Sequence, residues 1–273
     1  MKIGVFDSGI GGLTVVKQLL KLSAQEMPQI VYFGDTARVP YGTKSAATVI
    51  KFTQEIMEFL LRFEVNEVVV ACHTASSLAL ASLKDSSPVP VRGVIQPGVK
   101  QAVALTRKRK IGVIGTSSTI SSNAYGKELA AVAPEIELIS KSCPLFVPLA
   151  EEGWLDDSIS RQVAHRYLDP LVALGIDVLV LGCTHYPLLK GIIKEVAGRD
   201  ITVVDSAYAV AGEIGKDYRL SYTNDDTWKT RVNNCRFYVS DEPRRFQDTG
   251  EKFLGTTIRA VEKVEIERYI VNR

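Results

Sequence analysis

The chain has 273 residues, of which 46% are hydrophobic and 23% are charged, and its formal net charge is +2. This length allows one large domain or two smaller ones, and the apolar content excludes an intrinsically disordered chain. The nearly balanced charge disfavours a nucleic-acid binder, and no apolar run approaches the roughly 20 residues of a membrane-spanning helix. We therefore expect no nucleic-acid partner and no membrane partner.

The amino terminus enters an apolar strand directly, without the basic start and apolar core of a signal peptide. We therefore expect a cytoplasmic protein, in which cysteines are thiols rather than a disulfide framework. The four cysteines are Cys72, Cys143, Cys183 and Cys235. A basic run at 107–110 lies between a helical pattern and a strand, which predicts a solvated turn.

The first part of the chain alternates short apolar runs, which predict strands, with apolar residues at helical spacing. Strands are expected at 3–6, 30–33, 67–71 and 91–95, and helices at 13–20, 45–63 and 75–83. The glycine-rich turn at 7–12 matches neither a dinucleotide fingerprint nor a phosphate loop. Its glycines would let the backbone approach a small ligand, with Asp7 and Ser8 facing it. Residues 96–98 (Gln-Pro-Gly) predict a boundary.

The pattern then restarts, which indicates two related halves. The run from Lys110 repeats the run from Lys2, and Cys183 repeats Cys72, each roughly 110 residues later. In the second half we expect strands at 135–139, 178–181 and 201–204, and helices at 159–174 and 188–196. Strands that alternate with helices predict parallel sheets with right-handed crossovers.

The tail predicts a helix at 207–218, a strand at 237–240 and a helix at 244–254. We expect the tail to cross back and complete the first half. The fold class is then α/β, with two pseudo-symmetric domains, mainly parallel sheets and an active site in the cleft between them. The predicted domains are residues 1–96 with 207–273, and residues 97–206.

Cys72 and Cys183 each follow a buried strand, at the sheet edge where ligands bind in open α/β folds. Each also begins a helix, whose dipole favours thiolate over thiol. Three interpretations remain open. The thiols could be small buried hydrophobes, or they could bind zinc together with His73 and His185, although the spacing is unlike that of structural zinc sites. They could also be a pair of acid/base groups.

The acid/base interpretation uses the symmetry of the two thiols. Inverting a carbon centre requires one group to remove a proton from one face and a like group to return a proton to the other. A free thiol is only slightly ionised near neutral pH, so each thiol needs a helper. Asp7 and His185 are suited to hold or relay these protons.

The motifs of the chain, taken together, resemble those of bacterial glutamate racemases, in the aspartate/glutamate racemase superfamily. The resemblance is carried by Phe-Asp-Ser-Gly-Ile-Gly-Gly-Leu at 6–13, Val-Pro-Tyr-Gly at 39–42, Ala-Cys-x-Thr-Ala-Ser at 71–76 and Leu-Gly-Cys-Thr-His-Tyr-Pro at 181–187. It continues into 237–238 and 253–255 and so covers nearly the whole chain. It implies a cofactor-independent isomerase that interconverts L- and D-glutamate and supplies D-glutamate for peptidoglycan and cell-wall biogenesis. Members commonly form homodimers, but the sequence shows no recognisable dimer interface.

The resemblance also implies roles for individual residues. The catalytic set would be Cys72, Cys183, Asp7, His185 and Glu151, with Asp7 assisting Cys72 and with His185 and Glu151 assisting Cys183. The substrate, glutamate, would be held by hydroxyls and backbone groups of Ser8, Tyr41, Gly42, His73, Thr74 and Thr184, with Thr116 and Thr119 as second-tier candidates. No metal site is implied.

His73 departs from the family, which has asparagine at this position. The imidazole could contact the substrate, could lower the pKa of Cys72 if it were charged, or could be a tolerated substitution. Selectivity between glutamate and aspartate is not legible in the sequence, so a racemase for aspartate or another amino acid stays an alternative. A non-enzymatic zinc-binding module is the alternative from a different class.

Overall fold

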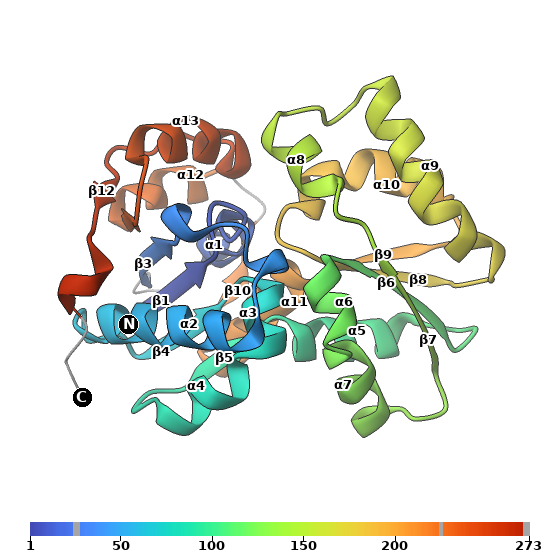
Figure 1. Cartoon of the computed structure of the whole chain (residues 1–273), viewed down its shortest axis with the longest axis horizontal. Coiled ribbons are helices and arrows are strands. Elements are labelled where there is room, and N and C mark those ends of the chain that lie inside the picture. The colour runs from blue at the N-terminus through green and yellow to red at the C-terminus, as the bar shows by residue number, and fades with distance from the viewer. Residues whose placement is uncertain (24–27, 224–225, 270–273) are drawn as a thin grey trace.

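Two parallel β-sheets, each flanked by helices, form the two sides of the molecule (Figure 1). The structure is a computed structural model that describes residues 1–23, 28–223 and 226–269. The first sheet has the order β12-β11-β3-β1-β4-β5. Its strands are β1 (Lys2–Asp7), β3 (Gln29–Gly34), β4 (Glu67–Val70), β5 (Val91–Gly93), β11 (Arg236–Val239) and β12 (Glu262–Lys263).

The second sheet has the order β7-β6-β8-β9. Its strands are β6 (Lys110–Gly115), β7 (Glu137–Ser142), β8 (Val178–Gly182) and β9 (Thr202–Asp205). A separate antiparallel pair joins β2 (Leu22–Ser23) to β10 (Ser221–Tyr222). The observed α/β class with parallel sheets is the predicted one.

The two halves share their strand order and their register. The run β3-β1-β4-β5 in the first sheet corresponds to β7-β6-β8-β9 in the second. Gly4 of β1 pairs with Val68 of β4, and Gly112 of β6 pairs with Leu179 of β8. The strands that lead to the two cysteines therefore occupy equivalent places, each beside the first strand of its half.

The strands are continuously apolar because helices cover both faces of the sheets. In β4, Val69 packs into one core with Ile3 and Val5, whereas Val68 and Val70 pack into the core on the other face. The helices of the first half are α1 (Leu13–Leu20), α2 (Ala46–Leu61), α3 (His73–Leu78) and α4 (Leu80–Ser86). Those that follow are α5 (Ile95–Leu105), α6 (Ser117–Ser121), α7 (Ala124–Val132), α8 (Phe146–Glu151), α9 (Ser158–Ala173) and α10 (Lys190–Ala197).

The remaining helical segments are α11 (Ser206–Asp217), α12 (Trp228–Arg231) and α13 (Pro243–Leu254), with short 3₁₀ turns η1 (Thr36–Arg38), η2 (Tyr41–Thr43), η3 (Tyr186–Leu189), η4 (Val232–Asn234) and η5 (Ile266–Tyr269). No helix of the described residues is long and apolar enough to cross a membrane.

Residues 96–98, where we expect a boundary, lie inside α5, because Pro97 falls in the first helical turn, where its missing N–H costs nothing. One local prediction is wrong. The single helix expected at 75–83 is instead two helices that meet at Ala79. The helices α7 and α8 were not predicted at all.

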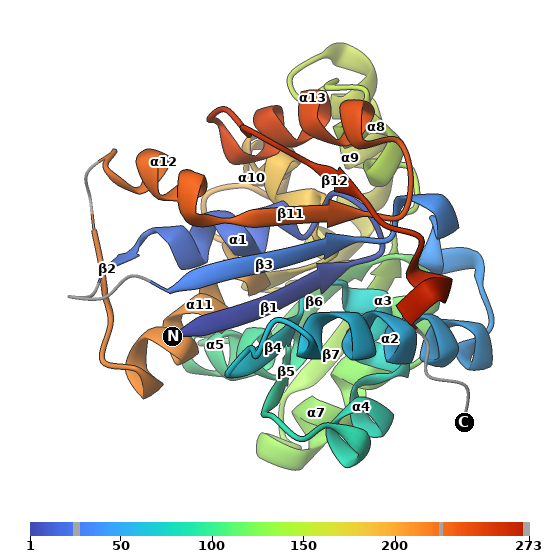
Figure 2. The same ribbon diagram turned by 90° about the vertical axis from the view of Figure 1, so that its left-hand side faces the viewer.

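The tail returns to the first sheet, where β11 pairs in parallel with β3 and with β12 (Figure 2). Helix α13 packs against α1 and β11 on that side. Helix α11 packs between the halves, against α1 and α5. The domain division at 96/97 and 206/207 stays a prediction, and parts of the predicted tail, 224–225 and 270–273, lie outside the described residues.

Candidate active site

A cavity of about 240 Å³ lies at the carboxyl edge of the strands, between the two halves. Ligands bind at this edge in open α/β sheets, and the volume suits a small molecule. The residues predicted for the site, with the exception of Asp7, all line it: Ser8, Tyr41, Gly42, Cys72, His73, Thr74, Glu151, Cys183, Thr184 and His185. The two thiols that the sequence singled out therefore share one cavity.

Cys72 lies at the amino end of α3, where its sulfur accepts a hydrogen bond from the N–H of Ala75 at 3.5 Å. Its thiol donates to the hydroxyl of Ser8, also at 3.5 Å. Burial, together with the charge of Asp7, raises the pKa of Cys72 to about 12, although Ser8 and Ala75 act in the opposite direction. The expected preference for thiolate is wrong here, because the end of this six-residue helix does not offset desolvation.

Asp7 ends β1 and lies behind the cavity wall, fully buried. Its carboxylate accepts hydrogen bonds from the N–H of Gly9 at 2.9 Å and from the hydroxyl of Thr184 at 3.3 Å. Burial raises the pKa of Asp7, although the charge of His185 opposes this. A carboxylate with a raised pKa is a stronger base, suited to accept a proton from a neighbouring thiol.

On the other side, His185 connects Cys183 to Glu151. Its Nδ1 lies 3.8 Å from the sulfur of Cys183, and its Nε2 lies 3.0 Å from Oε1 of Glu151. Burial acts to lower the pKa of His185, but hydrogen bonds to Cys183 and Glu151 and the charge of Asp7 outweigh it and raise the pKa to about 10. The hydrogen bond from His185 lowers the pKa of Glu151. An imidazolium beside Cys183 would stabilise its thiolate.

The glycine turn after β1 touches the second half. A Cβ on Gly11 would lie 2.2 Å from the hydroxyl oxygen of Thr184 and 2.6 Å from Nδ1 of His185. The hydroxyl of Thr14 donates to the carbonyl of Thr184 at 3.2 Å. Glycine at this position therefore allows the two strand ends to meet.

His73 is 4% exposed, and neither ring nitrogen has a hydrogen-bond partner among the described residues. Burial lowers its pKa to about 3, although the backbone of Leu181 opposes this. The imidazole is therefore neutral, and the alternative in which its positive charge lowers the pKa of Cys72 is wrong. A neutral ring carries one donor and one acceptor, and the backbone of Leu181 lies close enough to interact with it.

The loop that carries Tyr41 is held by Asp35, which the sequence analysis missed. The hydroxyl of Tyr41 donates to this buried carboxylate, which also accepts from Nε of Arg38 at 2.7 Å and from the hydroxyl of Ser240 at 2.9 Å. The Tyr41 hydroxyl is thus already used as a donor. The position of Asp35 in the sequence could have identified it, because Asp35 directly follows strand β3, just as Asp7 ends strand β1.

Three threonine hydroxyls connect the halves beside the cavity. The Thr74 hydroxyl lies 3.0 Å from that of Thr116 and 3.3 Å from that of Thr119. Gly42 adds a second link, because its carbonyl accepts a hydrogen bond from Ser118 at 2.5 Å. Thr116 lines the cavity, whereas Thr119 is buried beneath it.

All four cysteines are free thiols. Within residues 1–23, 28–223 and 226–269, no group of three or more His, Cys, Asp or Glu side chains is placed to hold a metal ion. The zinc interpretation of Cys72, His73, Cys183 and His185 therefore lacks a ligand set. Two buried thiols with different partners across one cavity are instead equipped for proton transfer.

Comparison with known proteins identifies the family of the chain. A family model described as Asp/Glu/Hydantoin racemase matches residues 3–214. A glutamate racemase from Syntrophus aciditrophicus is 50% identical over 265 residues, which cover 97% of this chain and 96% of that protein.

Solved structures give the same result for the fold. A glutamate racemase from Bacillus anthracis aligns with a TM-score of 0.87 at 37% identity, covering 96% of this chain and 97% of that one. A glutamate racemase from Francisella tularensis, solved in complex with D-glutamate, aligns with a TM-score of 0.85 at 39% identity, covering 98% of each chain. With a family match over most of its length and a relative half identical to it nearly from end to end, the chain belongs to the glutamate racemases of the Asp/Glu/hydantoin racemase family.

Proposed function

We propose that this chain interconverts L- and D-glutamate by passing the α-proton between Cys72 and Cys183. One observation carries the proposal: the two thiols follow equivalent strands of two pseudo-symmetric halves and line the same cavity. The names of the relatives support glutamate as the substrate, as does the relative solved with D-glutamate.

The reaction requires one cysteine as thiolate and the other as thiol. The thiolate removes the α-hydrogen of glutamate as a proton, and the electron pair of the broken C–H bond stays on the α-carbon beside the carboxylate. The opposite thiol then donates its proton to the other face of that carbon. Nothing is oxidised or reduced, and the two sulfurs have exchanged protonation states. The reverse reaction uses the same groups in exchanged roles.

The helpers differ on the two sides. Asp7 would accept the proton of Cys72, whose raised pKa otherwise keeps it as a thiol. His185, held by Glu151, would stabilise the thiolate of Cys183. The site is therefore symmetric in its two acid/base sulfur atoms and asymmetric in the groups that assist them.

Polar groups on the cavity wall would hold the two carboxylates and the ammonium group of glutamate. The hydroxyls of Ser8, Thr74 and Thr184 line the cavity, and the loop at 41–42 contributes backbone groups. His73 would add a neutral donor or acceptor. Tyr41 would act through the loop, because its hydroxyl is bound to Asp35.

The cellular role follows from the proposed product. A cytoplasmic enzyme that makes D-glutamate would supply peptidoglycan synthesis, and the gene should restore growth to a bacterium that requires D-glutamate. A homodimer is the proposed oligomeric state, to be checked by light scattering in the presence and absence of glutamate.

Incubation of metal-free protein with L-glutamate in D₂O tests the reaction. We expect D-glutamate carrying deuterium at the α-carbon, detected by NMR and chiral chromatography. Cys72→Ala and Cys183→Ala should each lower kcat by at least about 10³-fold while the fold persists. Cys235→Ala is the matched control, since Cys235 does not line the cavity. Near-full activity in either of the first two variants would refute the two-thiol assignment.

A panel of L-amino acids separates glutamate from aspartate, the second candidate substrate. The two differ by one methylene, which a fitted pocket discriminates by about 10- to 200-fold. We expect kcat/KM to favour glutamate by at least about 10-fold. A preference for aspartate would replace the substrate and leave the two-thiol mechanism in place.

A further inference from the structure

A second, smaller cavity adjoins the thiol cavity. It has a volume of about 140 Å³, and the two cavities share Gly9, Val39 and Glu151 in their walls. Its other lining residues come largely from the carboxyl-terminal part of the chain, from Glu242 to Thr249. The cavity therefore lies between the tail, which belongs to the first sheet, and the segment of the second half that carries Glu151.

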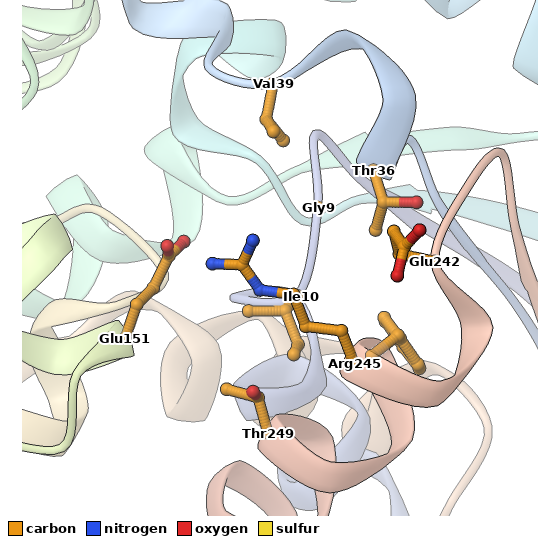
Figure 3. A pocket seen from close by; sticks show the side chains of 9 residues that line it. Gly9, Ile10, Thr36, Val39, Glu151, Glu242, Arg245 and Thr249 are labelled. Carbon is orange, nitrogen blue, oxygen red and sulfur yellow. The ribbon is translucent and has the colours of Figure 1, made fainter.

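Arg245 extends into this smaller cavity from α13. Its guanidinium points towards the carboxylate of Glu151, which ends α8 on the opposite wall (Figure 3). The charge of Arg245 acts on Glu151 and lowers the pKa of that carboxyl. The two groups do not form a contact ion pair in the described part of the chain, so their attraction acts across the cavity.

We propose that Arg245 is a positioning residue for the Cys183 side of the reaction, which keeps Glu151 ionised and turned towards His185. The attraction joins elements of different halves, because α13 packs on α1 and β11, whereas α8 packs on η3 and α9. Glu151 is 39% exposed in its side chain, so His185 alone does not enclose it. Arg245 supplies a second cation on the open side.

Charged groups on several elements lie around Glu151. His185 faces Glu151 from the start of η3, Arg245 faces it from α13, and Glu242 lines the far side of the same cavity. Glu152 follows Glu151 in its own segment. The cations that lower the pKa of Glu151 are His185 and Arg245, so the loss of Arg245 raises this pKa and favours a protonated Glu151 at acidic pH. A protonated Glu151 no longer stabilises the imidazolium of His185.

A second contact from the same helix supports this role for α13. The ring of Phe253 meets the imidazole of His185 edge to face, with centroids 5.5 Å apart at 88°. The helix thus bounds His185 with an apolar ring at one end and reaches its partner Glu151 with a cation at the other. Helix α13 is therefore placed to orient the whole His185–Glu151 pair.

The inference rests on the proposed function, and Arg245→Gln tests it. Near pH 4.5, the ordinary pKa of a glutamate carboxyl, we expect kcat to fall about 1.5- to 5-fold, the range for an exposed charge pair, with a smaller loss at pH 8. The acidic limb of the pH profile should move to higher pH, and Arg245→Lys should restore it. Arg244→Gln is the matched control, since Arg244 is the adjacent exposed arginine and does not line the cavity.

Two further measurements distinguish positioning from a general structural effect. In a Glu151→Gln background, Arg245→Gln should cause no additional loss, because its target is gone. The deuterium isotope effect should rise for one enantiomer of α-deuterated glutamate only, the one whose proton Cys183 removes. An Arg245→Gln variant that behaves like Arg244→Gln, or whose loss persists in full beside Glu151→Gln, would overturn the inference. Absence of racemisation by the unmodified protein would instead refute the proposed function.

Discussion

The hydroxyl of Thr184 donates a hydrogen bond to the carboxylate of Asp7 at 3.3 Å, and so joins the end of β8 to the end of β1. The same hydroxyl lies 3.5 Å from Nδ1 of His185. One small side chain thus connects Asp7 to His185, the proposed helpers of Cys72 and Cys183. This connection couples the two sides of the cavity and motivates the first prediction.

Thr184→Val should weaken both the fold and the reaction. The substitution keeps the shape but leaves the buried Asp7 carboxylate without one of its donors, which costs about 1–3 kcal/mol. It should also raise the pKa of Asp7 further, because the Thr184 hydrogen bond lowers it. Urea unfolding and kcat measured for the valine and serine variants check this. Thr184→Ser keeps the hydroxyl and should be less impaired than Thr184→Val. A valine variant with unchanged stability and kcat would show that the hydroxyl does not support Asp7.

His185 should make stability depend on alkaline pH. Its pKa is raised to about 10 from an ordinary value of 6.5, so its contribution is fully present below about pH 6.5 and is lost as the pH rises through about 10. The slope from this one proton cannot exceed about 1.4 kcal/mol per pH unit. Urea unfolding at several pH values, compared with His185→Asn, isolates it from other groups. Parallel stability curves for the two proteins would show that folding does not raise the pKa of His185.

His73 should stay neutral across the physiological range. Its pKa is lowered to about 3, so NMR of the ring nitrogens should show no titration between pH 5 and 9. The unfolded chain takes up a proton at His73 below about pH 6.5 and the folded chain does not, so His73 should lower the free energy of unfolding at acidic pH. His73→Asn removes this slope and, as a neutral donor and acceptor, should keep kcat within about 10-fold. An imidazolium signal at pH 6 would contradict the assignment.

Tyr41→Phe tests whether the hydroxyl holds the loop or the substrate. Its bond to the buried Asp35 predicts a loss of about 1–3 kcal/mol in the free energy of unfolding, with a rise in KM that follows from the loosened loop. Ser240→Ala, which removes another donor to Asp35 from outside the cavity, should produce the same pattern more weakly. A higher KM with unchanged stability in Tyr41→Phe alone would mean that the hydroxyl contacts substrate directly.

The sequence by itself determined the local pattern of this protein. Continuous apolar runs predicted buried strands, because helices cover both faces of each sheet, and the repeat after about 110 residues predicted two equivalent halves. The positions of Cys72 and Cys183 at strand ends placed them at one edge before any contact was known. These features are legible because they depend on periodicity and on near neighbours in the chain.

Tertiary structure decided whatever depends on partners far apart in the chain. Three pairs of side chains carry no periodic signal: Asp35 with Ser240, Asp7 with Thr184, and Glu151 with Arg245. Nothing local specifies which of these side chains meet. The pKa of Cys72 also depends on groups that are far apart in the chain. Its place at a helix start suggested a thiolate, whereas burial and a neighbouring carboxylate, which only the folded chain supplies, raised the pKa instead.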